Sequence, residues 1–423
     1  MLDRKIAPEF KQVDNIHFIE PNNYQLDNGI KIHTLSGGSQ EILKIDFIFK
    51  AGQSQQEKPL IATATNFLMK EGSEKYTAKE IADGVDQYGA FLQSDVSFDN
   101  AAITLYTLTK HLDKVMPFAK DVICNPIFSE KEFENYQRNA IERFKINLEK
   151  GSFIARKEFM HALFGNNPLG KNTTLADYQN LTLSEIKQFY TDFYSLNNCE
   201  IIVSGNVNQK VIDTLNLFFG KENLGKSKLN EKVDFTSLKP QQLHIKKEKA
   251  LQSAIRIGRK LPNKLHQDYY GLQILNTVFG GYFGSRLMKN IREDKGYTYG
   301  IGSGVASFLD GGYFYISTEV GSDVTKDALK EVYKELDIIR TEEIGSEELE
   351  LVKNYLLGKL LKSCDGPFNM AALYENVYSY GLDYDFYNNY IKTIKEITPK
   401  TLLALGVKYL NPTDLTEVVV GDF

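Results

Sequence analysis

Apolar and polar residues alternate along several short stretches in the first half of the chain, which is the pattern of half-buried β-strands. Residues 42–51 (ILKIDFIFKA) alternate in this way, and residues 24–34 contain two strand-like stretches around an Asp27-Asn28-Gly29 turn. Between such stretches, apolar residues recur at helical spacing. The pattern predicts further strands at 90–96 and 101–108, and helices at 59–69, 77–88, 112–124 and 130–149.

The second half of the chain repeats this order of elements. Residues 253–258 (SAIRIG) have the pattern of a strand, and residues 267–279 that of a helix. Two more strands are predicted at 297–305 and 312–319, followed by long helices at 322–340 and 346–362. The repeated order suggests that the two halves share one fold.

The closing segments of the two halves can be aligned directly. In each half a threonine precedes a predicted helix, and the strand that follows ends in a glycine. These residues are Thr182 and Gly205 in the first half, and Thr398 and Gly421 in the second, so both pairs are 216 positions apart. One shared offset indicates a duplicated unit, because internal repetition at this length means tandem domains.

We therefore predict an α+β protein of two tandem homologous domains, each a mostly antiparallel sheet with helices packed on it. The predicted domains span residues 14–220 and 246–423, and the polar, lysine-rich residues 221–245 have the composition of a flexible linker. A chain of 423 residues is also longer than one ordinary hydrophobic core requires.

Composition excludes some classes of partner and of chemistry. Hydrophobic residues make up 42% of the chain and charged residues 25%, as in globular proteins generally. The net charge is −5 and there is no long basic stripe, which argues against nucleic acid as a partner. The three cysteines, Cys124, Cys199 and Cys364, are far apart and are expected to be buried free thiols.

The N-terminal residues contain no apolar segment of the kind found in signal peptides. No apolar run approaches the roughly 20 residues that a transmembrane helix needs. The expected location is cytoplasmic as the sequence stands, or periplasmic if a signal peptide was removed.

Residues 280–300 (GGYFGSRLMKNIREDKGYTYG) form the most distinctive local motif. Ser285 is a candidate N-cap for a helix that begins at Arg286. Arg292 and Tyr299 lie seven positions apart, and a cation and a phenol can together hold a carbonyl oxygen that gains negative charge. The alternative is that Arg292 makes a salt bridge and the tyrosines of this motif belong to the core.

This motif resembles the second-half signature of the insulinase/pitrilysin-like zinc peptidases, the inverted zincins. Two shorter stretches are similar to the same family, namely Asn28-Gly29-Ile30 and Asn125-Pro126-Ile127-Phe128. The resemblance covers nearly the whole chain. It implies two α+β domains around a chamber that admits an unfolded peptide.

The resemblance also implies roles for individual residues. Arg292 and Tyr299 correspond to the pair that holds the substrate carbonyl, and Tyr297 is the competing choice for the tyrosine. The glycine-rich run is expected to contact the peptide backbone; it consists of Gly280, Gly281, Tyr282, Phe283 and Gly284.

The zinc-binding half of the family pattern is absent. Active members carry an HxxEH motif, in which two histidines bind zinc and the glutamate activates water. Here Thr63 and Phe67 stand in place of the histidines and Asn66 in place of the glutamate, and the third-ligand position falls at about Glu142 or Arg143. None of the six histidines begins an HxxEH pattern. We expect no zinc in this chain, and zinc in a partner subunit.

Three hypotheses for the function follow. The leading one is the non-zinc subunit of a heteromeric peptidase, inactive alone, whose partner is a homologous HxxEH-bearing chain. The second is a catalytically inactive peptide-binding or scaffold protein, similar to the core subunits of respiratory complexes. The third is a self-sufficient peptidase or another enzyme.

Overall fold

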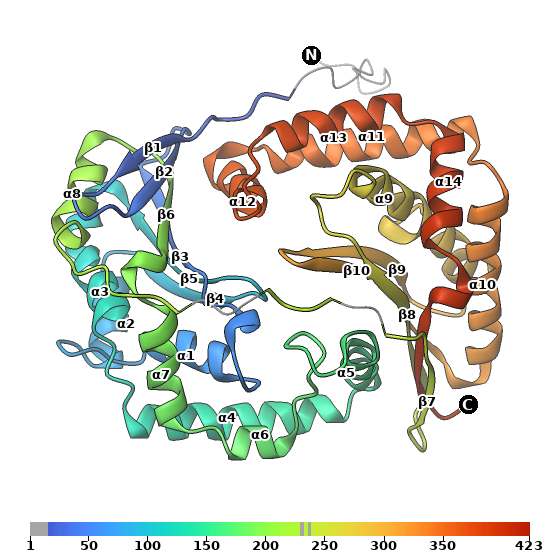
Figure 1. The fold of residues 1–423 in the computed structure, drawn as a ribbon, viewed down its shortest axis with the longest axis horizontal. Coiled ribbons are helices and arrows are strands. Elements are labelled where there is room, and N and C mark those ends of the chain that lie inside the picture. Colours follow the sequence, from blue (N-terminus) through green and yellow to red (C-terminus); the bar gives the residue numbers. More distant parts are fainter. Residues whose placement is uncertain (1–15, 229–231, 236–237) are drawn as a thin grey trace, which may run out of the picture.

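Two β-sheets with helices packed on them form the two halves of the molecule (Figure 1). The computed structural model describes residues 16–228, 232–235 and 238–423. The N-terminal residues 1–15, which include the start of the first predicted domain, and residues 229–231 and 236–237 of the predicted linker lie outside the described residues.

The first half contains a six-stranded sheet in the order β1-β2-β6-β3-β5-β4. Its strands are β1 (Asn22–Gln25), β2 (Lys31–Ser36), β3 (Ile42–Phe49), β4 (Phe91–Val96), β5 (Ala101–Leu108) and β6 (Cys199–Gly205). Its helices are α1 (Ile61–Met69), α2 (Ala78–Asp86), α3 (Leu112–Cys124), α4 (Glu130–Leu148), α5 (Gly151–Phe164), α6 (Leu175–Gln179), α7 (Leu183–Phe193) and α8 (Gln209–Phe219).

The second half contains a five-stranded sheet in the order β7-β11-β8-β10-β9. Its strands are β7 (Gln242–Lys246), β8 (Gln252–Leu261), β9 (Ile301–Phe308), β10 (Gly311–Gly321) and β11 (Thr416–Gly421). Its α-helices are α9 (Tyr269–Asn276), α10 (Thr325–Thr341), α11 (Ser346–Ser363), α12 (Gly366–Tyr378), α13 (Asp385–Glu396) and α14 (Pro399–Tyr409), and two π-helical segments are η4 (Thr277–Gly281) and η5 (Met288–Asp294).

Apart from β1, which has no counterpart, the strands of the two sheets follow the same order, β2-β6-β3-β5-β4 and β7-β11-β8-β10-β9. In the first, β6 lies parallel to β2 and antiparallel to β3. In the second, β11 lies parallel to β7 and antiparallel to β8. The helices before these strands also start alike, because the side chains of Thr182 and Thr398 each accept a hydrogen bond from the backbone N–H three residues later. The predicted α+β fold of two similar domains is confirmed.

Some predicted boundaries need correction. Residues 242–245, placed in the linker from their composition, belong to β7, where they pair with β11. The helix expected over 267–279 begins at Tyr269 and continues into η4. All three cysteines are free, and burial raises the pKa of Cys124 to about 12.

Each half lends one helix to the other half's sheet. Helix α5, from the first half, packs on β8 and β11, with Phe159 in one apolar cluster with Val418 and Val420. Gly258 on β8 makes room for this helix, since a Cβ there would lie 2.9 Å from Cζ of Phe159 and 2.0 Å from the carbonyl oxygen of Phe314. Figure 1 shows α5 at the foot of the second sheet.

Helix α12 makes the reciprocal contact with β2 and β6 of the first sheet. Its Met370 and Tyr374 share a buried cluster with Leu35 and Ile202. The Tyr374 hydroxyl lies 3.3 Å from Nδ1 of His33 on β2. Each sheet therefore has one face covered by helices of its own half and the other covered in part by a helix of its neighbour.

The two halves also meet at the turns of two hairpins, β4–β5 in the first half and β9–β10 in the second. The Leu309 N–H, in the β9–β10 turn, donates to Oδ2 of Asp99 in the β4–β5 turn at 3.1 Å, and the rings of Phe98 and Phe308 lie 4.9 Å apart. Burial raises the pKa of Asp99 to about 6. Burial likewise lowers the pKa of the nearby Lys264 to about 8. The junction thus holds two charged groups in an environment that disfavours charge.

Among the described residues, no helix is both long enough and apolar enough to cross a lipid bilayer.

Candidate functional site

Helix α1 carries the three residues that the family resemblance places at the zinc-binding positions, and two of them, Asn66 and Phe67, are engaged in packing. Asn66 is almost fully buried and its Nδ2 donates to the carbonyl oxygen of Ala102 on β5 at 3.3 Å. The ring of Phe67 packs against Tyr136 of α4, with the ring centroids 5.2 Å apart. Thr63, one turn earlier on α1, lines a hollow of about 500 Å³. An amide and an aromatic pair thus join α1 to its neighbours.

Helix α4 brings the third position to this hollow. Tyr136, Ala140, Arg143 and Asn147 all line it, at a spacing that places them on one face of the helix. Glu142 is exposed and accepts a hydrogen bond from Lys145 at 2.8 Å. Of the two residues named from the sequence for the third position, Arg143 is therefore the one that reaches the hollow.

These residues do not fit a zinc ion. Zinc in proteins is held by thiolate, imidazole and carboxylate ligands, and the hollow offers a hydroxyl, a phenyl ring and a guanidinium at the corresponding positions. Within the residues that the structure describes, no group of three or more His, Cys, Asp or Glu side chains could hold a metal ion.

Arg292 lies near the end of η5, and its guanidinium has three neighbours. Its Nε donates to the backbone carbonyl oxygen of Tyr299 at 3.0 Å, and its Nη1 lies 4.0 Å from Oε1 of Glu293. Its Cζ lies 4.6 Å from the ring centroid of Phe283, an exposed aromatic residue of the glycine-rich run. The side chain remains 34% exposed, so its outer nitrogens are accessible to a ligand.

The two candidate tyrosines have opposite environments. Tyr297 packs against the core of the second half, and its N–H donates to the carbonyl oxygen of Ile291. Tyr299 is 94% exposed. In the part of the chain that the structure describes, its hydroxyl has no hydrogen-bond partner.

The loop that carries Tyr299 is tied down by its neighbours. The Thr298 hydroxyl donates to the carbonyl oxygen of Glu319 on β10 at 2.7 Å and accepts from the Thr318 hydroxyl at 3.0 Å. Sequence alternation predicted a strand from residue 297, but this loop delays the start of β9 until Ile301. The Thr298 hydroxyl also bonds locally, with the backbone of Gly300, but its contacts with β10 join residues about 20 positions apart and leave no local signal in the sequence.

The glycine-rich run divides into a buried start and an exposed end. Gly280 is buried, and a Cβ there would lie 2.5 Å from the Ser303 hydroxyl on β9, so close packing requires this glycine. Gly281 and Tyr282 are half-buried, whereas Phe283 and Gly284 are exposed. Only the exposed end presents its backbone and side chains freely to a peptide.

The segment after the run corrects one sequence expectation. Ser285 precedes the helical turn at Arg286, but its hydroxyl is buried without a hydrogen-bond partner among the described residues, so it does not cap the helix. Arg286 instead forms two hydrogen bonds with the Glu348 carboxylate, at 2.8 and 2.7 Å.

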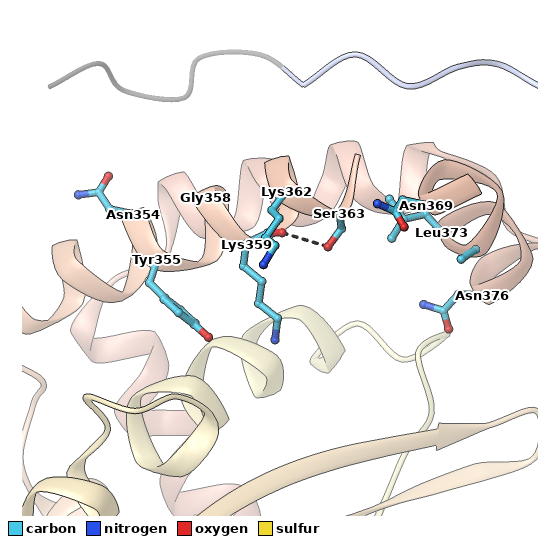
Figure 2. A pocket seen from close by; sticks show the side chains of 10 residues that line it. Asn354, Tyr355, Gly358, Lys359, Lys362, Ser363, Asn369, Leu373 and Asn376 are labelled. Carbon is cyan, nitrogen blue, oxygen red and sulfur yellow. Dashed lines mark hydrogen bonds between the residues drawn. The ribbon is translucent and has the colours of Figure 1, made fainter. Parts of the chain in front are cut away.

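A hollow of about 950 Å³ between α11 and α12 lies next to this run. Figure 2 shows Tyr355 and Lys359 on the lower side of α11, with Asn376 of α12 beyond them. The ring of Tyr355 packs against that of Tyr282, with the centroids 4.8 Å apart. The hollow is lined by Asn354, Tyr355, Gly358, Lys359, Lys362, Ser363, Asn369, Ala372, Leu373 and Asn376.

Comparison with known proteins shows similarity to one family of peptidases. Residues 47–177 match the family model described as insulinase (peptidase family M16), and residues 180–356 match the peptidase M16 inactive domain. The uncharacterized zinc protease YmxG of Bacillus subtilis is 26% identical over 81% of this chain and 84% of its own length. The non-peptidase homolog YmxG of Helicobacter pylori is 24% identical over 89% of this chain and 88% of its own length.

Among solved structures, the peptidase M16 inactive domain from Pseudomonas fluorescens has the same fold. It superimposes with a TM-score of 0.85 at 22% identity, over 95% of this chain and 98% of that one.

Proposed function

Because this chain belongs to the insulinase family of peptidases, family M16, we propose that it is the non-zinc subunit of a heteromeric peptidase. It binds an unfolded peptide and supplies Arg292 and Tyr299 to the transition state. The zinc and its activating glutamate come from a homologous HxxEH-bearing subunit. The chain alone is inactive.

The observation that carries this proposal is the arrangement of Arg292 and Tyr299. The loop between them is held by the hydrogen bonds of Thr298, yet the Tyr299 ring is 94% exposed. A rigid loop that holds an aromatic ring in solvent has no evident benefit for the stability of the isolated chain. It does suit a surface that is completed by a second protein and its substrate.

In that complex, the chemistry of these groups is straightforward. Attack on a peptide carbonyl places negative charge on its oxygen, and a guanidinium and a phenol placed in advance stabilise that charge. Phe283 and the main-chain contact with Tyr299 limit the positions open to the Arg292 guanidinium. Less freedom is therefore lost when the transition state forms.

A second candidate is a catalytically inactive peptide-binding or scaffold protein. The observation that favours it is the similarity to the non-peptidase homolog of Helicobacter pylori over most of both chains. Both candidates share the missing zinc ligands at Thr63, Asn66 and Phe67. They differ in whether a zinc-bearing partner exists.

The deciding experiment is reconstitution. The chain is expressed with an HxxEH-bearing homologue from the same genome, purified through a tag on this chain, and assayed with an unfolded peptide. Cleavage by the co-purified pair, and none by this chain, is expected. If no HxxEH homologue co-purifies, or if the homologue cleaves equally fast without this chain, the scaffold function replaces the proposal.

A further inference from the structure

The hollow beside Thr63 and Phe67 of α1 is lined by charged residues of one sign. Arg143 of α4, Arg156 and Lys157 of α5, and Lys171 of the following loop all line it, and no Asp or Glu of the described chain does. The chain as a whole has a net charge of −5. The lining of the hollow is therefore locally positive, although the chain as a whole carries a net negative charge.

These four cations are not used in ion pairs within the described part of the chain. Lys171 donates through Nζ to the backbone carbonyl oxygen of Glu57 at 3.0 Å, and Arg143 through Nε to that of Asn139 at 3.4 Å. Lys157 lies 6.0 Å from the ring centroid of Phe144. All these partners are uncharged, so none of them neutralises the cations, and an anion bound among the cations would do so.

Nearby acids do not fill this role. Glu142 points away from the hollow and accepts from Lys145. Glu158 accepts a hydrogen bond from Nδ2 of Asn172, at 3.2 Å to one carboxylate oxygen and 3.4 Å to the other. Even with Glu158 counted, positive charge predominates around the hollow.

The hollow also has an aromatic lining, which we call its floor: Phe67, Tyr136, Phe144, Phe153 and Tyr178. Phe67 packs against Tyr136, and Phe144 lies 4.8 Å from Tyr178 and 5.9 Å from Phe153, measured between ring centroids. A bare inorganic anion would leave this apolar floor uncovered. A peptide can place a carboxylate among the cations at the rim and an apolar side chain on the floor, so it satisfies both surfaces.

We propose that this hollow binds the carboxylate of a peptide, from an acidic side chain or a C-terminus, beside an apolar residue of the same peptide. A position that holds a metal cation in active relatives thus binds an anion here. The proposal rests on the proposed function in one respect, namely that the ligand is a peptide. It does not depend on Arg292 or Tyr299.

Isothermal titration calorimetry of the full chain at low salt tests this with three peptides. Acetyl-AAFEAA-amide carries one side-chain carboxylate, acetyl-AAFQAA carries only a C-terminal carboxylate, and acetyl-AAFQAA-amide carries neither. At least one carboxylate peptide is expected to bind roughly tenfold or more tightly than the neutral one, because hydrogen bonds to charged groups are the stronger kind. The carboxylate peptide that binds more tightly identifies the source of the anion.

Two double variants that remove the same amount of charge distinguish binding in the hollow from binding to surface cations in general. Arg143→Gln with Arg156→Gln removes two lining cations, and roughly a tenfold loss of carboxylate-peptide affinity is expected. Arg138→Gln with Lys145→Gln removes two exposed cations of α4 that do not line the hollow, and less than about a twofold change is expected. The melting temperatures of both variants are compared with that of the unmodified chain.

Three results would overturn the proposal: equal binding of all three peptides, no binding of any, or equal losses in the two double variants. Inorganic phosphate titrated alone is the remaining probe, and binding as tight as that of the preferred peptide would assign the hollow to free anions instead. Failure here is distinguishable from failure of the proposed function, because turnover by the reconstituted pair and its dependence on Arg292 are measured separately.

Discussion

Arg292 and Tyr299 are joined through the main chain and not through their side chains. The Arg292 Nε donates to the Tyr299 carbonyl oxygen at 3.0 Å, and the phenol of Tyr299 extends into solvent. The contact fixes the distance between the two residues but leaves the hydroxyl and the outer guanidinium nitrogens available. Under the proposed function, both groups act on the substrate carbonyl oxygen.

Replacing either group should lower turnover more than stability. In the reconstituted pair, Arg292→Ala or Tyr299→Phe is expected to reduce kcat by roughly 10²–10³-fold, the usual effect of losing one oxyanion donor. The melting temperature of Tyr299→Phe should not change, because the hydroxyl has no partner in the described part of the chain. Steady-state kinetics and thermal unfolding measure the two effects.

Lys289→Ala is the matched control for Arg292, since Lys289 is an exposed cation on the same π-helical segment. It should retain wild-type kcat. Wild-type turnover by both Arg292→Ala and Tyr299→Phe would mean that the pair has no part in the chemistry.

If Thr63, Asn66 and Phe67 occupy the positions of the HxxEH motif, specific substitutions should create a zinc site. The unmodified chain should contain far less than one zinc per molecule by elemental analysis, because Thr63 and Phe67 cannot act as the histidine ligands. The triple variant T63H/N66E/F67H restores HxxEH but leaves the Arg143 guanidinium at the hollow. Adding R143E should raise the zinc content toward one per chain.

The matched comparison for that variant is T63H/N66E/F67H/E142H. Residue 142 lies on the exposed side of α4, so a histidine there should not add zinc. Equal zinc contents in the two quadruple variants would show that α4 does not contribute its Arg143 face to the site.

The hairpin junction predicts a pH dependence of stability. Burial raises the pKa of Asp99 to about 6, from 3.8 when exposed. Between about pH 4 and 6 the folded state binds this proton more tightly than the unfolded state, so the contribution of Asp99 to stability falls as the pH rises through that window. A tenfold difference in proton affinity between the two states corresponds to about 1.4 kcal/mol of stability.

Asp99→Asn removes the buried charge that destabilises the fold at higher pH, and it keeps a side-chain oxygen that can accept from the Leu309 N–H. The variant should gain more in melting temperature at about pH 7.5 than at about pH 5, and the exposed Asp95→Asn on the neighbouring strand should gain little at either. An equal effect of Asp99→Asn at both values of pH would contradict the raised pKa.

The contact between α5 and the second sheet should be a major source of stability. Phe159→Ala removes a fully buried ring from the cluster with Val418 and Val420, and a loss of about 3–5 kcal/mol is expected in denaturant unfolding. Leu217→Ala, at a residue that is 75% exposed, should change stability by less than about 0.5 kcal/mol. Similar effects of the two substitutions would mean that α5 is only loosely attached.

Much of the fold could be predicted from the sequence, because the local pattern of apolar and polar residues matches the local secondary structure. The strand predicted at 101–108 and the helix at 112–124 match β5 and α3 residue for residue. The offset between Thr182 and Thr398 located equivalent helix starts, since an N-cap is a local signal.

Features that depend on tertiary contacts were not predictable in the same way. Nothing local in α5 indicates that it packs on the opposite sheet. The four cations of the hollow extend from residue 143 to residue 171, so they form no stripe in the sequence. The sequence could, however, have decided between Glu142 and Arg143 as the residue at the hollow. Tyr136, Ala140 and Arg143 share a helical face that excludes Glu142.

The reciprocal placement of α5 and α12 gives the chain the geometry of a domain-swapped dimer whose two protomers are fused. Each half supplies a helix to the sheet of its neighbour, so packing joins the halves in addition to the covalent segment between α8 and β7. Two fragments produced by cleavage within that segment would each retain one exchanged helix. Such fragments should reassociate by complementation, whereas either one alone would expose the apolar face of its sheet.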